Sequence, residues 1–168
     1  MKKIIFLLFL FPSKLFSQSI IIKDIDLVKI KSIISENKFT LVHFWGTWCS
    51  PCVKEVPKLI ELSKSFDIVK LVSINDPMSS TKQINKILIS SNYSDSVSFI
   101  LDKKIYNKSA TKNIKKFTKD ICLKCALEDT DFIFSGIYLF EKNGNLVYYN
   151  KSSDYIDELE LVLKKLMK

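Results

Sequence analysis

Hydrophobic residues along the chain fall into short continuous runs separated by stretches with helical spacing. Three runs are apolar nearly throughout, which is typical of strands covered on both faces: Phe39–Trp45, Ile68–Ile74 and Val97–Leu101. A shorter run at residues 20–22 predicts an edge strand. The stretches between the runs predict helices over residues 25–37, 50–66, 80–91 and 104–122.

The C-terminal part of the chain predicts a hairpin and a final helix. Ile137–Phe140 and Leu146–Tyr149 flank Asn143-Gly144, a dipeptide that favours tight hairpin turns. A helix is predicted to begin near Ser153, with acidic residues in its first turns and lysines in its last, so that both ends compensate the helix dipole. Strands that alternate with helices and end in a hairpin and a helix predict an α/β fold.

Composition limits the classes of protein to which the chain can belong. Its 168 residues are 47% hydrophobic and 26% charged, which is the balance of one globular domain. The formal net charge is +8, yet every basic residue is a lysine and none is an arginine. Arginine is the preferred residue for recognising phosphates and bases, so the composition argues against a nucleic-acid-binding protein.

The first residues have the layout of a secretory signal peptide. Met1–Lys3 is basic, Ile4–Phe11 is apolar, and Leu15–Ser17 ends in a small residue suited to cleavage. We therefore predict a signal peptide over residues 1–17 and one domain over residues 18–168. The alternative is an uncleaved segment, which would be the chain's only contact with a membrane. Either interpretation predicts a periplasmic or otherwise exported protein in an oxidising compartment.

Candidate chemistry is concentrated at Cys49 and Cys52, where a predicted strand gives way to a predicted helix. Unpaired N–H groups and the positive end of the helix dipole stabilise a thiolate at such a position. Cys49 is therefore the predicted nucleophile. Cys52, three residues later, is placed to attack a mixed disulfide formed on Cys49. A structural disulfide and half of a zinc site are the alternatives.

The stretch Phe44–Cys52, followed by Glu55, Val56 and Pro57, resembles the active site of thioredoxin-fold oxidoreductases, most closely the exported TlpA/ResA-like branch. The resemblance implies a thioredoxin-like α/β fold with a central mixed β-sheet flanked by helices on both faces. It implies a protein-disulfide oxidoreductase that needs no cofactor. Its partners would be a disulfide-containing protein substrate and an upstream membrane thiol reductase. Elsewhere the resemblance consists of element order only, over about residues 25–167.

The resemblance also suggests roles for residues around the two cysteines. Trp48 would wall the site and offer a surface to a substrate peptide, although simple packing is the alternative. Ser50 and Pro51 would set the relative stability of dithiol and disulfide. His43 occupies the position of a buried acid that exchanges a proton with the resolving thiol, a task that imidazole can perform. A histidine that merely packs in the strand is the alternative.

One position departs from the family pattern. Family members carry a cis-proline opposite the two cysteines, where this chain has Ser135 preceded by Phe134. A cis bond without proline costs about 3 kcal/mol, so we predict a trans Phe134–Ser135 bond and an altered substrate groove. The family's proline also keeps metals off the two thiols, so its loss would make metal capture easier.

A second pair, Cys122 and Cys125, has no counterpart in the family pattern. The two residues can form a structural disulfide, act as a second dithiol that relays electrons, or supply half of a four-thiolate metal site. No metal site is assigned from the sequence. An alternative function is therefore a four-cysteine metal-binding or redox-sensing module. A thioredoxin-fold domain that binds partners without reductase activity is a third.

Overall fold

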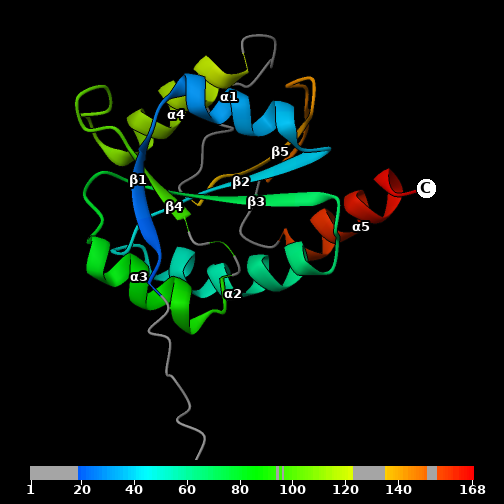
Figure 1. Ribbon diagram of the computed structural model, residues 1–168, viewed down its shortest axis with the longest axis horizontal. Helices are drawn as coiled ribbons and strands as arrows, with labels where there is room; N and C mark the ends of the chain where they lie inside the picture. Colours follow the sequence, from blue (N-terminus) through cyan, green and yellow to red (C-terminus); the bar gives the residue numbers. More distant parts are fainter. Residues whose placement is uncertain (1–18, 94, 96, 123–134, 151–154) are drawn as a thin grey trace, which may run out of the picture.

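The computed structural model describes residues 19–93, 95, 97–122, 135–150 and 155–168 (Figure 1). Within these ranges six strands and five helices follow one another along the chain. They are β1 (Ile21–Ile25), α1 (Leu27–Glu36), β2 (Phe39–Trp45), α2 (Ser50–Lys64), β3 (Val69–Asn75), α3 (Thr81–Ser90), β4 (Val97–Leu101), α4 (Ala110–Ile121), β5 (Ile137–Glu141), β6 (Leu146–Tyr149) and α5 (Ile156–Leu166).

All six strands join one mixed sheet in the order β1-β4-β3-β2-β5-β6. The first four strands in this order pair in parallel, whereas β5 runs antiparallel to both β2 and β6. β2 lies inside the sheet, and all seven of its residues are buried. Its register with β3 runs from Phe39–Val69 to Trp45–Asn75, so these two strands end at the same edge of the sheet.

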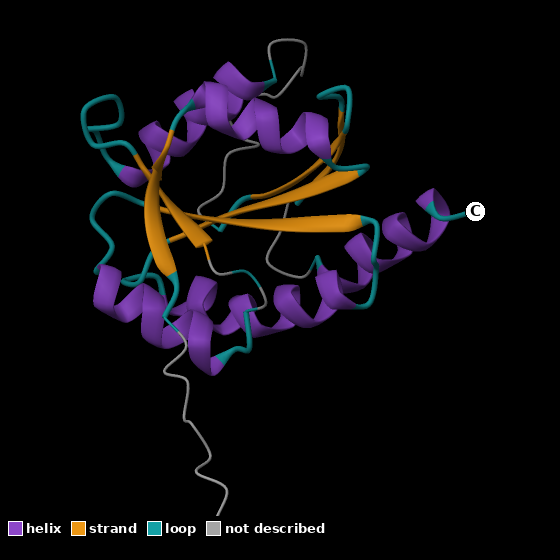
Figure 2. Ribbon diagram, viewed as in Figure 1, coloured by secondary structure: helices purple, strands orange, loops and turns teal. Residues whose placement is uncertain are grey.

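Helices cover both faces of the sheet, as the resemblance implied (Figure 2). One core lies under α2, α3 and α5 and contains Leu41 and Trp45; the other lies under α1 and α4 and contains Val42 and Phe44. Successive side chains of β2 therefore enter opposite cores, as the pleat of a strand requires. This explains why the sequence of β2 is a continuous apolar run.

Two predicted boundaries at the N-terminal end are shifted. The predicted strand at residues 20–22 extends as β1 to Ile25, which the sequence pattern had placed in the following helix. Asp26 then caps α1, because its carboxylate accepts a hydrogen bond of 2.8 Å from the Lys29 N–H. α1 therefore begins at Leu27.

The predicted start of the fourth helix is wrong. Apolar spacing places it at Lys104, but α4 begins at Ala110. Asp102 winds the intervening chain into a turn: its carboxylate accepts from the Lys104 N–H and its carbonyl from the Tyr106 N–H, both at 2.8 Å. Tyr106 still packs on Phe117, with ring centroids 5.3 Å apart, so it contributes to the helical apolar pattern from a loop.

The other elements agree with prediction within a few residues, including the hairpin of β5 and β6. The predicted start of the last helix at Ser153 and the predicted signal peptide at residues 1–17 lie outside the described residues. In the part of the chain that the structure describes, no helix has the length and apolar character needed to cross a membrane.

Candidate functional site

Cys49 and Cys52 form a disulfide at the start of α2, with Cα atoms 5.3 Å apart. β2 ends at Trp45, and the Cys49 N–H donates to the Gly46 carbonyl at 3.0 Å, so the chain turns before the helix begins. Cys49 is the N-cap residue, and its sulfur accepts the Cys52 N–H at 3.4 Å. In the reduced protein the same N–H and the helix dipole favour a Cys49 thiolate.

The two sulfur-bearing residues differ in accessibility. Cys49 is partly exposed, whereas Cys52 is fully buried in the core under α2. A sulfur of another molecule can therefore approach Cys49 and not Cys52. Cys52 can react only with the sulfur already beside it. The division between an attacking Cys49 thiol and a resolving Cys52 thiol stays a prediction.

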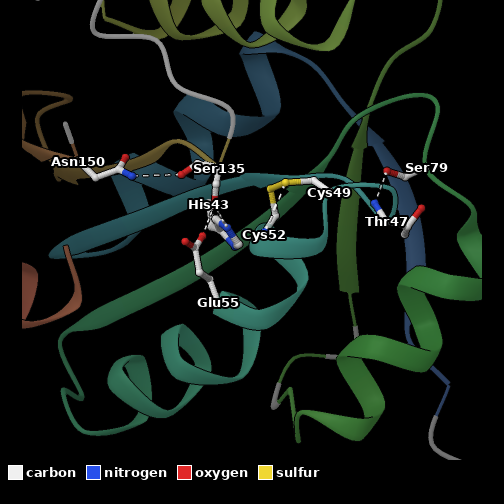
Figure 3. Close-up of a disulfide and its surroundings, with 8 residues drawn as sticks. All are labelled: His43, Thr47, Cys49, Cys52, Glu55, Ser79, Ser135 and Asn150. Atoms are coloured by element: carbon white, nitrogen blue, oxygen red, sulfur yellow. Dashed lines mark hydrogen bonds between the residues drawn. A yellow bond between two sulfur atoms is a disulfide. The ribbon is translucent and has the colours of Figure 1, made fainter. Parts of the chain in front are cut away.

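A cluster of three polar side chains lies on one side of the disulfide (Figure 3). Nε2 of His43 lies 3.4 Å from the Ser135 hydroxyl oxygen, and that hydroxyl donates a hydrogen bond to the Glu55 carboxylate. Because the serine has a single hydroxyl hydrogen, its oxygen accepts from His43, which places the imidazole proton on Nε2. His43 comes from β2, Glu55 from α2, and Ser135 from the segment just before β5.

Burial determines the charge of His43, which is 2% exposed. Desolvation lowers the pKa of the imidazole from 6.5 to about 3, so the side chain is neutral at neutral pH. Its ring stacks on Trp45 with centroids 6.4 Å apart. His43 is therefore a hydrogen-bond donor in the cluster and a weak base.

Ser135 stands where the family pattern has proline, and its backbone has a φ of 74°. A proline ring fixes φ near −65°, so this conformation excludes proline. The Ser135 carbonyl accepts from Nδ2 of Asn150 at 3.2 Å, and Oδ1 of Asn150 accepts from the Ile137 N–H at 2.7 Å. Phe134 lies outside the described residues, so a trans Phe134–Ser135 bond stays a prediction.

On the other side of the disulfide the loop after β2 is tied to the loop after β3 (Figure 3). The Thr47 N–H donates to the Ser79 hydroxyl, and the Ser80 N–H donates to the Thr47 hydroxyl, both at 3.2 Å. Trp48 is 51% exposed, and the neighbouring Ser50 and Pro51 are also exposed. The predicted substrate-facing residues on this side are therefore in solvent.

Glu55 belongs to the sequence motif, but the motif alone indicates no function for it. Its position three residues after Cys52, close to one helical turn, was the available signal. The link from Thr47 to Ser79 was also missed. It joins residues 32 positions apart, and nothing in the local sequence of either loop indicates it.

Cys122 lies at the end of α4, in the core on the opposite face of the sheet from Cys52. It is 7% exposed and disulfide-bonded; Cys125 lies outside the described residues. Among the described residues no three His, Cys, Asp or Glu side chains form a group able to hold a metal ion.

Two curated relatives match short parts of the chain. Sporulation thiol-disulfide oxidoreductase A of Bacillus subtilis (strain 168) is 41% identical over 46 residues, which is 26% of this chain and 28% of that protein. Thiol-disulfide oxidoreductase ResA of Bacillus thuringiensis (strain Al Hakam) is 39% identical over 46 residues, or 27% of each chain. The chain thus spans about a quarter of the length of these relatives.

Similarity across the whole domain comes from structure. A thiol:disulfide interchange protein of the thioredoxin family from Chlorobium tepidum TLS superposes with a TM-score of 0.57 at 12% identity, covering 82% of this chain and 83% of that one. The fold is therefore thioredoxin-like. The model of the Redoxin family matches residues 18–163, which include every described strand and most of α5. The chain belongs to the Redoxin family.

Proposed function

We propose that the protein is an exported thiol–disulfide oxidoreductase that exchanges disulfides with partner proteins through Cys49 and Cys52. The observation that carries this proposal is the pairing of a partly exposed sulfur at the N-terminus of α2 with a fully buried one. A disulfide that only stabilised the fold would not need one sulfur open to solvent. The names of the two Bacillus relatives describe the same class of reaction.

The reaction proceeds in two exchange steps. In the dithiol form the Cys49 thiolate attacks a partner's disulfide, forms a mixed disulfide and releases one partner thiolate. The Cys52 thiolate then attacks the Cys49 sulfur and releases the second partner thiolate. Two electrons pass to the partner, whose two sulfurs take up protons, and Cys49 and Cys52 become the disulfide of the present structure.

The second step requires a proton acceptor, because a thiol in a dry core does not ionise unaided. Glu55 follows Cys52 by three residues on α2, and its carboxylate already accepts the Ser135 hydroxyl hydrogen. We assign the acceptor role to Glu55. His43, with its pKa near 3, is a positioning residue that holds the Ser135 oxygen.

The cellular arrangement follows from the proposed chemistry and from the N-terminal sequence. The partner is a protein with a disulfide, and an upstream membrane thiol reductase returns the Cys49–Cys52 disulfide to the dithiol. Residues 1–17 direct export and are cleaved, leaving residues 18–168 in the periplasm or an equivalent compartment.

Reduction of insulin by the dithiol form tests this function. Cys49→Ser removes the accessible nucleophile and should abolish activity. Cys52→Ser keeps the nucleophile but cannot resolve the intermediate, so it should accumulate a mixed disulfide that mass spectrometry detects. Undiminished activity of Cys49→Ser would remove the pair from the reaction.

A further inference from the structure

Two large apolar side chains are more than half exposed in the loops that follow β2 and β3, close to the disulfide. Trp48 adjoins Cys49 and is 51% exposed, and Met78, in the loop between β3 and α3, is 71% exposed. Methionine is among the residues most often buried in folded proteins. Both sequence neighbours of Met78, Pro77 and Ser79, are buried. The exposure of Met78 is thus local to one side chain.

The backbone of this loop is fixed on both sides of Met78. The Met78 N–H donates to the Asp76 carboxylate and the Ser79 N–H donates to the Asp76 carbonyl, each at 2.9 Å. Asp76 is 2% and Ser79 7% exposed, and Pro77 restricts the backbone between Asp76 and Met78. The turn therefore presents the Met78 side chain outward without requiring the chain to order on binding.

The Met78 loop is also tied to the loop that carries Trp48. The Asp76 N–H donates to the Trp45 carbonyl at 3.0 Å, which continues the pairing of β2 with β3 beyond the strands. Thr47 exchanges hydrogen bonds with Ser79 and Ser80, each at 3.2 Å. The residues next to Met78 and Trp48 thus hold the two loops side by side, next to the disulfide (Figure 3).

We propose that Trp48 and Met78 form a docking surface for an apolar side chain that flanks the cysteine of a disulfide-bearing polypeptide partner. This inference rests on the proposed function. A mixed disulfide places the partner sulfur about 2.05 Å from the Cys49 sulfur, so the partner residues nearest its cysteine must contact the loops around Cys49.

Exposure differs between the two sides of the disulfide among the residues that the structure describes, and the partner's apolar residue contacts the Met78 side. On the side of the polar cluster, Ser135 is 6% exposed and its carbonyl already accepts from Asn150. On the other side, Trp48 and Met78 offer apolar surface. The flexible thioether of methionine adapts to side chains of different shape, so Met78 selects an apolar neighbour without selecting one sequence.

Two model peptides that contain the same disulfide test the preference. One has leucine and the other serine next to the reactive cysteine, with equal net charge, and the reduced full chain is mixed with each under pseudo-first-order conditions. We expect the leucine peptide to react about five- to tenfold faster, which is the effect of burying part of one apolar side chain. Met78→Ser should bring the ratio to about one, and Met78→Leu should restore it.

Two controls separate docking from chemistry. The rate with 5,5′-dithiobis(2-nitrobenzoate), which has no flanking residue, should be the same in Met78→Ser and the unchanged chain. Ile89→Ser removes another exposed apolar side chain, on α3, and should leave the peptide ratio intact. An absent preference in the unchanged chain, or a preference that survives Met78→Ser, overturns the docking surface. The proposed function fails separately, if Cys49→Ser reduces both peptides at the normal rate.

Discussion

Burial lowers the pKa of His43, and this shift makes the free energy of unfolding depend on pH. Because the pKa of His43 is about 3 in the folded chain and near 6.5 when unfolded, only the unfolded state binds its proton between these values. The stabilisation from neutral His43 is therefore present above about pH 6.5 and is lost as the pH falls toward 3. We expect the free energy of unfolding of the native chain, relative to His43→Asn, to fall by about 1 kcal/mol per pH unit below 6.

Urea unfolding of both chains at pH 7, 5 and 4 measures this difference. The subtraction removes the contributions to the pH dependence that the two chains share. Two stability curves that stay parallel from pH 7 to 4 would show that His43 is protonated in the folded state.

The proposed role of Glu55 as the acceptor of the Cys52 proton can be tested by replacing its carboxylate with an amide. Glu55→Gln keeps the size of the side chain and removes its ability to accept the Cys52 proton. Resolution of the mixed disulfide should slow about 100-fold at pH 7, the usual contribution of a general base, while attack by Cys49 changes little. Rapid acid quench followed by mass spectrometry separates the two steps. Glu61→Gln, an exposed carboxylate on the same helix, is the matched control.

The sequence alone identifies Cys49 and Cys52 as a candidate site, because their spacing and their place between a strand and a helix are local features. The polar cluster could not be predicted in the same way. Ser135 meets Glu55 across 80 residues, and the contact depends on the antiparallel pairing of β5 with β2. A resemblance predicted that residue 135 would lie opposite the cysteines, but not which side chains its hydroxyl would bond.

At the scale of elements, the predicted boundaries are correct where only one structural arrangement produces the apolar pattern. The boundaries of β2 are as predicted, because a strand between two cores is apolar along its whole length. The start of α4 was wrong because Tyr106 continues the helical spacing from a turn that Asp102 stabilises. Helical spacing of apolar residues shows that their side chains pack on the same core, and a buried residue of a loop can continue that spacing.

The segment that leads into β5 is packed too closely for an added methyl group. A Cβ on Gly136 would lie 2.6 Å from Cε2 and 2.9 Å from the hydroxyl oxygen of Tyr138, a side chain that is 1% exposed. Gly136→Ala should therefore lower the free energy of unfolding by about 1–3 kcal/mol, as overpacking of a core does. Since Gly136 follows Ser135, resolution should slow as well.

Thermal and urea unfolding measure the loss at Gly136. Gly144→Ala is the comparison, because a Cβ there contacts nothing and only its φ of 83° is unfavourable. A destabilisation of Gly136→Ala no larger than that of Gly144→Ala would mean that Tyr138 moves aside without cost.

At the scale of the whole molecule, the sheet lies between Cys52 and Cys122. Cys52 belongs to the core under α2, α3 and α5, and Cys122 belongs to the core under α1 and α4. Disulfide exchange requires sulfur atoms in bonding contact, and Cys122 cannot reach Cys52 through an intact sheet. The spacing of the cysteines along the sequence cannot predict that Cys52 and Cys122 lie on opposite faces of the sheet.

The double variant Cys122→Ala/Cys125→Ala tests whether the second pair serves stability or electron transfer. Because Cys122 is disulfide-bonded and 7% exposed, we expect insulin reduction within about twofold of normal. The melting temperature should fall, since the predicted Cys122–Cys125 disulfide would close a short loop and contribute about 2 kcal/mol. Cys49→Ser in the same background should remain inactive. Loss of insulin reduction in the double variant, with its fold intact by circular dichroism, would instead make the second pair a carrier of electrons to Cys49 and Cys52.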